Sequence, residues 1–113
     1  MTDLKASFFR FEDDALQRLL LDTLNRLGVS YGRARDGSIT FAERDRTAVM
    51  DAVCSVRDTR FPWYLLQCRT EDEYDRCREA LDAARLPYVV ERQESGIWLL
   101  VRREDRPWHE EQL

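Results

Sequence analysis

Residues 63–73 read WYLLQCRTEDE. The aromatic and apolar run predicts a β-strand over residues 63–69. Thr70, followed three positions later by Glu73, forms a capping box, in which the hydroxyl and the carboxylate satisfy the free amides at a helix start. A strand therefore leads directly into a helix. The apolar spacing that follows is helical and predicts that this helix buries Tyr74, Cys77, Leu81 and Ala84.

Two more strands are expected after this helix, over residues 87–92 and 97–102, with Ser95-Gly96 between them. Residues 106–109 predict a final turn of helix. The second half of the chain therefore reads as strand, helix, hairpin and short helix.

The first half shows the same pattern. A strand is expected over residues 4–11, and the acids at 12–14 favour a helix start that ends at Gly28. Val29–Arg35 and Ser38–Glu43 predict a hairpin around Asp36-Gly37. Asp45 can cap a second helix with an apolar stripe. The stripe consists of Ala48, Val49, Ala52, Val53 and Val56.

A shift of 59 residues brings the two halves into register and predicts an internal duplication. The proposed copies are residues 4–57 and 63–113, joined by a linker at 58–62, within a single domain of residues 1–113. In this register Leu16 and Leu20 fall on Asp75 and Glu79, so the apolar helix stripes do not coincide. The alternative is that two unrelated units look alike because caps and turns use few residue types.

The element order predicts an α+β fold with two tandem βαββ(α) units, an antiparallel sheet and helices packed on one face. This order resembles the ferredoxin-like fold. It also resembles the paired ferredoxin-like units of small-molecule-sensing regulatory domains and of dimeric α+β barrels. The resemblance lies in element order alone and implies no functional residues.

One strand of the second half is apolar on both faces. If Ile39 and Phe41 face the helices in the first half, then Ile97, Leu99 and Val101 lie on the opposite face in the second. A strand that is apolar on both faces is buried on both. This back face is expected to be covered by the first copy, as a sheet-on-sheet sandwich, by a second subunit, or by a partner.

Composition excludes several classes of protein. The chain has 113 residues, 43% of them hydrophobic, and a net charge of −4 with acids and bases intermixed. It therefore lacks the basic stripe typical of nucleic-acid binders, and no nucleic-acid partner is expected. The longest apolar run is five residues, at 97–101, and no secretory signal is seen at the start, so no membrane partner and a cytoplasmic location are expected. The three cysteines, Cys54, Cys68 and Cys77, are expected to be reduced thiols.

The sequence shows no constellation of catalytic residues. His109, the one histidine, lies five residues from the end of the sequence and is expected in a solvated tail. Without further histidines a zinc site is not expected, and the four glycines form no phosphate-binding loop, so no cofactor is expected. The acidic clusters at 12–14 and 71–73 are interpreted as helix caps.

Three hypotheses for function follow. The first is a non-enzymatic protein-binding module, such as an inhibitor, an immunity or antitoxin-like protein, or a regulatory subunit, bound to another protein or to itself as a homodimer. The second is a small-ligand sensor with its site between the two units, and the third is an enzyme with an unrecognised acid–base site. Candidate interface residues are Phe61, Trp63, Tyr64, Ile97, Leu99 and Val101, and candidate anion or ligand residues are Arg33, Arg92 and Tyr31.

Overall fold

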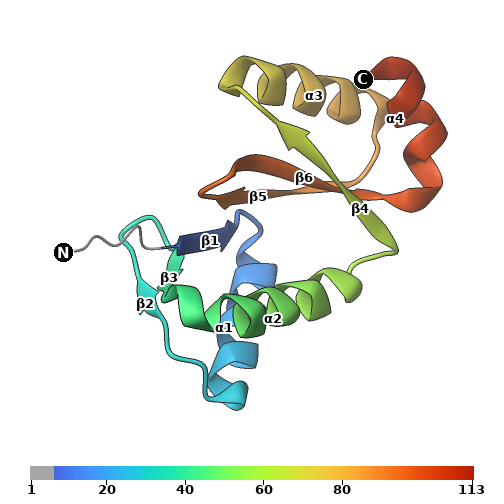
Figure 1. Ribbon diagram of the computed structural model, residues 1–113. Helices are drawn as coiled ribbons and strands as arrows, with labels where there is room; N and C mark the ends of the chain where they lie inside the picture. The colour runs from blue at the N-terminus through green and yellow to red at the C-terminus, as the bar shows by residue number, and fades with distance from the viewer. Residues whose placement is uncertain (1–6) are drawn as a thin grey trace.

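A six-stranded antiparallel sheet and four α-helices form the computed structural model, which describes residues 7–113 (Figure 1). The first half contains β1 (Ser7–Phe11), α1 (Asp14–Leu27), β2 (Gly32–Arg33), β3 (Ile39–Phe41) and α2 (Arg46–Asp58). The second contains β4 (Trp63–Cys68), α3 (Glu71–Ala84), β5 (Tyr88–Gln93), β6 (Gly96–Arg102) and α4 (Arg106–Gln112). A 3₁₀ turn precedes α2 at Glu43–Asp45 and α4 at Arg103–Asp105. Residues 4–6 of the expected first strand lie outside the described residues.

The strands follow the order β2-β3-β1-β5-β6-β4 in one continuous sheet. The halves meet where β1 pairs antiparallel with β5, with Phe9 opposite Gln93 and Phe11 opposite Glu91. The first half therefore does not pack on the second as a sheet-on-sheet sandwich. Instead, the two halves share a sheet edge to edge.

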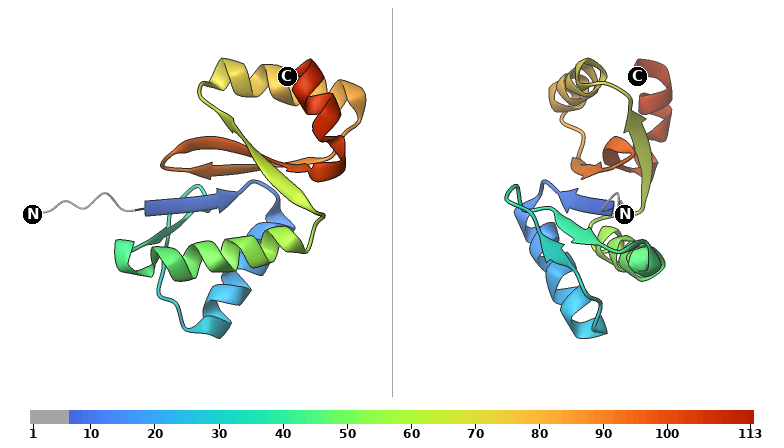
Figure 2. Two further views of the ribbon diagram at one scale, coloured as in Figure 1. Left: turned by 45° about the vertical axis from the view of Figure 1, so that its right-hand side comes forward. Right: turned by 60° about the vertical axis from the view of Figure 1, so that its left-hand side comes forward.

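The expectation that all helices lie on one face is wrong. Helices α1 and α2 cover one face of the sheet, and α3 and α4 cover the other (Figure 2). The reason lies in β5 and β6, whose alternate residues belong to different cores. Val89 and Leu100 join the core beneath α1 and α2, whereas Val90 and Leu99 join the core beneath α3 and α4. A strand that is apolar on both faces is thus covered twice by this chain's own helices.

The starts of α1 and α3 follow from local sequence as predicted, whereas Asp45, the expected cap of α2, forms no side-chain capping hydrogen bond. Asp13 Oδ1 accepts a hydrogen bond from the Leu16 amide at 3.0 Å, and Thr70 Oγ1 accepts one from the Glu73 amide at 3.0 Å. Glu73 Oε1 accepts a hydrogen bond from the Arg69 amide at 3.1 Å, one residue before the N-cap Thr70, so the return bond differs from that of the expected capping box. Gly28 ends α1 in the left-handed conformation, with φ 71°. The stripe of α2 is buried except for the half-buried Ala48, whereas Ala84 at the end of α3 is exposed.

Three elements differ in length from expectation, and one of them, β3, spans only Ile39–Phe41 and not residues 38–43. β2 spans only Gly32–Arg33, and α4 runs over Arg106–Gln112, longer than the single turn expected. Gly32 lies so close to β3 that an added Cβ would be 2.7 Å from Thr40 Oγ1, so this strand pairs tightly despite its length. Among the described residues, no helix has the length and apolar character needed to cross a membrane.

Candidate functional site

β4 lies at one end of the sheet and pairs on one side only, with β6. Its six residues, Trp63–Cys68, carry no charged side chain. The opposite end of the sheet is β2, which is two residues long and exposed. The long free edge of the sheet therefore belongs to β4, where the candidate interface residues Trp63 and Tyr64 also lie.

The backbone of β4 presents hydrogen-bonding groups to solvent. The Arg103 amide donates to the Pro62 carbonyl at 2.9 Å. This bond shows which opposed residues of β4 and β6 are hydrogen-bonded to each other. Because opposed residues alternate between bonded and non-bonded pairs, the backbone groups of Trp63, Leu65 and Gln67 point away from β6. In agreement, Arg103 Nε donates from outside the ladder to the Trp63 carbonyl at 2.8 Å.

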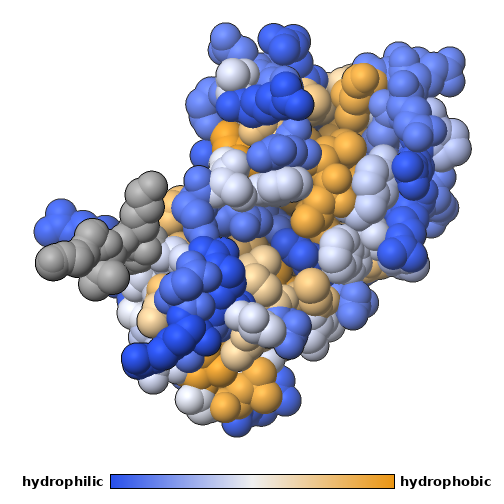
Figure 3. Space-filling view, in the orientation of Figure 1, coloured by the Kyte–Doolittle hydropathy of each residue, from blue (hydrophilic) through white to orange (hydrophobic). Residues whose placement is uncertain are grey.

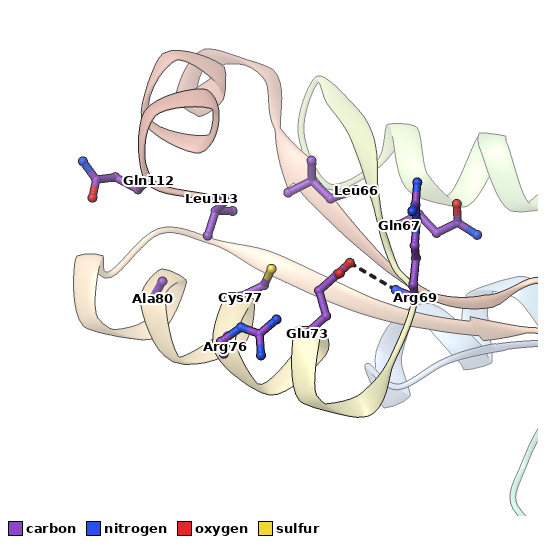
Figure 4. Close-up of a pocket in the computed structure, with 9 residues that line it drawn as sticks. All are labelled: Leu66, Gln67, Arg69, Glu73, Arg76, Cys77, Ala80, Gln112 and Leu113. Atoms are coloured by element: carbon purple, nitrogen blue, oxygen red, sulfur yellow. Dashed lines mark hydrogen bonds between the residues drawn. The ribbon is translucent and has the colours of Figure 1, made fainter.

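A groove of about 620 Å³ lies where β4 meets α3 and the end of α4. Leu66 from β4, Cys77 from α3 and Leu113 from the end of the chain point toward one another within it (Figure 4). On the molecular surface, apolar side chains gather in the same region, between the polar outer sides of α3 and α4 (Figure 3). An apolar floor thus lies beside the free edge strand.

Two arginines and one glutamate line this groove. Arg69 and Arg76 line it and are exposed, and neither forms an ion pair with any residue of the described chain. Glu73 also lines it, and its carboxylate accepts a hydrogen bond from the Arg69 backbone amide while keeping its negative charge. The groove therefore offers two free guanidinium groups beside an apolar surface.

The cysteines near the groove are unsuited to nucleophilic chemistry. Burial raises the pKa of Cys68 to about 12 and also raises the pKa of Cys77. The thiolate is the reactive form, so these side chains act as small apolar groups at neutral pH. Among residues 7–113, no cluster of His, Cys, Asp and Glu is arranged to hold a metal ion.

His109 lies in the protein interior, contrary to the expectation of a solvated tail. It is 2% exposed because α4 folds back over β4, where its Nδ1 forms a hydrogen bond with the Tyr64 hydroxyl. The Arg106 guanidinium stacks over the Tyr64 ring at 5.5 Å. Burial lowers the pKa of His109, against a smaller opposing effect of Asp105. His109 therefore joins α4 to the edge strand as a neutral side chain.

The remaining candidate interface residues lie at different depths. Ile97, Leu99 and Val101 are 7%, 0% and 0% exposed, in the core beneath α3 and α4. This chain covers the face they form, so they offer no surface to a partner. Phe61 and Trp63 are half-buried against the other core, and the Trp63 ring receives the Arg57 guanidinium at 4.8 Å.

The candidate ligand residues do not converge. Arg33 on β2 and Arg92 on β5 are separated in the sheet by β3 and β1. Arg92 forms ion pairs with Glu12 and Glu71, and the Tyr31 hydroxyl donates to Asn25 Oδ1 at 2.9 Å. The structure therefore does not gather these three side chains around one ligand.

Sequence reasoning found the edge strand's aromatic residues but missed the groove residues Arg69, Arg76 and Cys77. A signal existed in Leu66 and Cys68, which share one face of the predicted strand, but their helix partners could not be read from spacing. Comparison with known proteins gives no relative: no family model, curated protein or solved structure matches this chain.

Proposed function

We propose that this protein is a non-enzymatic protein-binding module that takes an extended segment of a partner onto β4. The observation that carries the proposal is a six-residue, uncharged edge strand beside an apolar groove. In strand addition, main-chain hydrogen bonds supply affinity, and pockets for alternate side chains supply specificity. β4 offers outward backbone groups at alternate residues, and the groove offers the pocket.

The lack of protection along β4 supports this proposal. Edge strands are usually guarded against unwanted pairing by shortness, by charged side chains or by proline within the strand. β2 has only two residues, one of which is Arg33. β4 has none of these features between Trp63 and Cys68, apart from the Arg103 side chain on the Trp63 carbonyl. An edge of this kind is suited to binding a strand.

The proposal is tested by removing one outward donor from β4. The Gln67 amide points away from β6 and its side chain is exposed, so proline at this position removes no bond of the sheet. Peptides selected from a random decapeptide library against the wild-type protein are measured by titration on Gln67→Pro and on the matched control Gln67→Ala. We expect Gln67→Pro to weaken binding about tenfold or more, and Gln67→Ala to bind as the wild type does.

The location of the bound peptide tests whether it binds along β4. On addition of peptide, the amide chemical shifts of the protein are expected to change along β4 and α3. Thermal unfolding curves are expected to show that both Gln67 variants are folded. Selected peptides that leave the β4 amides unchanged, or that bind Gln67→Pro as tightly as wild type, would overturn the proposal.

The two halves are also proposed to be copies of one ferredoxin-like βαββ(α) unit. Their strand orders, β2-β3-β1 and β5-β6-β4, place the third strand of each half between the first two. Each hairpin is followed by a 3₁₀ turn and a helix. The caps support a revised register, because Asp13 and Thr70 begin α1 and α3, and Gly28 and Arg85 end them, both pairs 57 residues apart. In this register Leu20 and Leu24 correspond to Cys77 and Leu81, whereas Leu16 falls on Glu73, so the helix stripes agree in part.

A reducing compartment such as the cytoplasm is proposed as the site of action. In support, Cys54, Cys68 and Cys77 are free thiols, with no disulfide among them.

A further inference from the structure

The chain already contains one example of a strand bound at an edge equivalent to that of β4. β1 and β4 are the first strands of their halves, each followed by a helix and each paired with the third strand of its half. On its other side β1 pairs antiparallel with β5, whereas the corresponding side of β4 is free. The pairing of β5 with β1 therefore shows which side chains a strand bound at the free edge of β4 would direct toward the helices.

β5 presents one apolar and one acidic side chain to the helices of the first half. Val89 packs into the core beneath α1 and α2. Glu91, two residues further on the same face, is bound by Arg57 of α2 with N–O distances of 2.9 and 2.6 Å. Beside β1, the strand β5 thus directs an apolar residue and an arginine-bound carboxylate toward the helices of the first half.

The groove beside β4 offers the same combination of surfaces. Its floor is apolar, formed by Leu66, Cys77 and Leu113, and its cations are Arg69 and Arg76. These arginines are exposed and form no ion pair within residues 7–113. A carboxylate on an incoming strand would supply the counter-charge that Glu91 supplies to Arg57.

We propose, on the basis of the strand addition proposed above, that the segment bound by β4 is an antiparallel strand of a different protein. Its pattern is an apolar residue and an acidic residue two positions apart, both directed into the groove. The acidic side chain pairs with Arg76 or Arg69 at the groove rim. Opposite charge at such a rim orients the segment and selects it against neutral or basic ones.

The charges on the free strands of this chain disfavour a second copy of it as the strand bound beside β4. β4 contains no acidic residue, so a β4–β4 pair would bring no carboxylate to Arg69 or Arg76 from the added strand. β2, the other free strand, carries Arg33 and is followed by Arg35, which would add positive charge. The complementary strand therefore comes from a different sequence.

The test uses peptides selected on the wild-type protein from a random decapeptide library, and the same peptides with each Asp or Glu replaced by Asn or Gln. We expect the selected peptides to contain an acid two positions from an apolar residue, and its replacement to weaken binding about fivefold. With the double variant Arg76→Gln/Arg69→Gln, replacing the acid of the peptide is expected to leave the affinity unchanged. Arg18→Gln/Arg26→Gln, with the same change of charge on exposed positions of α1, is the control and retains the fivefold difference.

The outcomes separate this inference from the function on which it rests. Peptides that shift the β4 amides but bind equally well without their acid would overturn the acidic pattern and leave strand addition standing. Peptides that bind away from β4 would overturn both. A wild-type dimer by light scattering that Gln67→Pro converts to a folded monomer would identify a second copy as the occupant and overturn the foreign partner.

Discussion

Arg57 on α2 and Glu91 on β5 form a buried ion pair with two hydrogen bonds, 2.9 Å from Nε to Oε2 and 2.6 Å from Nη2 to Oε1. The two side chains are 4% and 0% exposed. Trp63 of β4 lies over the guanidinium at 4.8 Å, so three elements from both halves meet at this pair. The ion pair therefore lies between the two halves, on α2 of the first and β5 of the second.

Breaking this pair is predicted to be costly. Glu91→Gln keeps the shape of the side chain but leaves the Arg57 guanidinium buried without a counter-charge. We expect the free energy of unfolding to fall by about 3–5 kcal/mol, measured by urea denaturation followed by circular dichroism.

The double variant Arg57→Met/Glu91→Leu separates the loss of the pair from the burial of an unpaired charge. Because both charges are removed, it is expected to be more stable than Glu91→Gln alone. A double variant as unstable as the single one would contradict this explanation.

Leu99 provides the second prediction, because it lies at the centre of the core beneath α3 and α4 with 0% exposure. Leu99→Asp is expected to cost more than about 4 kcal/mol and to unfold the chain, since it buries a carboxylate in an apolar core. Leu27→Asp is the matched control, because Leu27 is 61% exposed at the end of α1. Two-dimensional NMR spectra should show dispersed peaks for Leu27→Asp and collapsed peaks for Leu99→Asp. A folded, monomeric Leu99→Asp would show that this face is not a core.

Local signals predicted much of the secondary structure. Thr70 and Glu73 cap a helix through atoms within four residues of each other, so their effect can be read from sequence. The arrangement of the sheet could not be read in this way. It depends on the pairing of Phe11 with Glu91, which are far apart in the chain, and this pairing places α1 and α2 opposite α3 and α4.

Glu91 and His109 show why the candidate site was predicted only in part. Glu91 is buried on the same strand face as Val89, but the sequence analysis did not single it out, and nothing in the sequence identified Arg57 as its partner. His109 lies near the end of the sequence, which suggested solvent exposure, yet α4 folds back onto Tyr64. Trp63 and Tyr64 were identified from their aromatic character. Their position at a free edge follows from the strand order.

His109 gives a prediction for pH dependence. Burial lowers its pKa in the folded chain below the ordinary value of 6.5. Well above pH 6.5 the side chain is neutral in both states, and its contribution to stability is complete. As the pH falls below 6.5, the unfolded chain binds a proton before the folded chain does, so stability is lost. We expect the urea midpoint of the wild type to decrease over this range.

The variant His109→Gln isolates this effect from the other pH-dependent contributions to stability. Its urea midpoint is expected to change less than that of the wild type between pH 7.5 and pH 5.5. Parallel pH profiles for the two proteins would mean that His109 is as easily protonated when folded as when unfolded.

The ends of α1 and α3 supply a paired prediction in opposite directions. Gly28 and Arg85 both end their helices with positive φ, at 71° and 57°. A residue with a Cβ is strained in this conformation, whereas glycine adopts it freely. Arg85→Gly is therefore expected to stabilise the protein by up to about 1 kcal/mol. Gly28→Ala is expected to destabilise it by about 1 kcal/mol, and since an added Cβ at Gly28 meets no atom within 4 Å, no steric clash contributes to this loss. Urea denaturation of both variants at pH 7 measures the difference, and a stabilising Gly28→Ala or a destabilising Arg85→Gly would show that backbone strain does not govern these two helix ends.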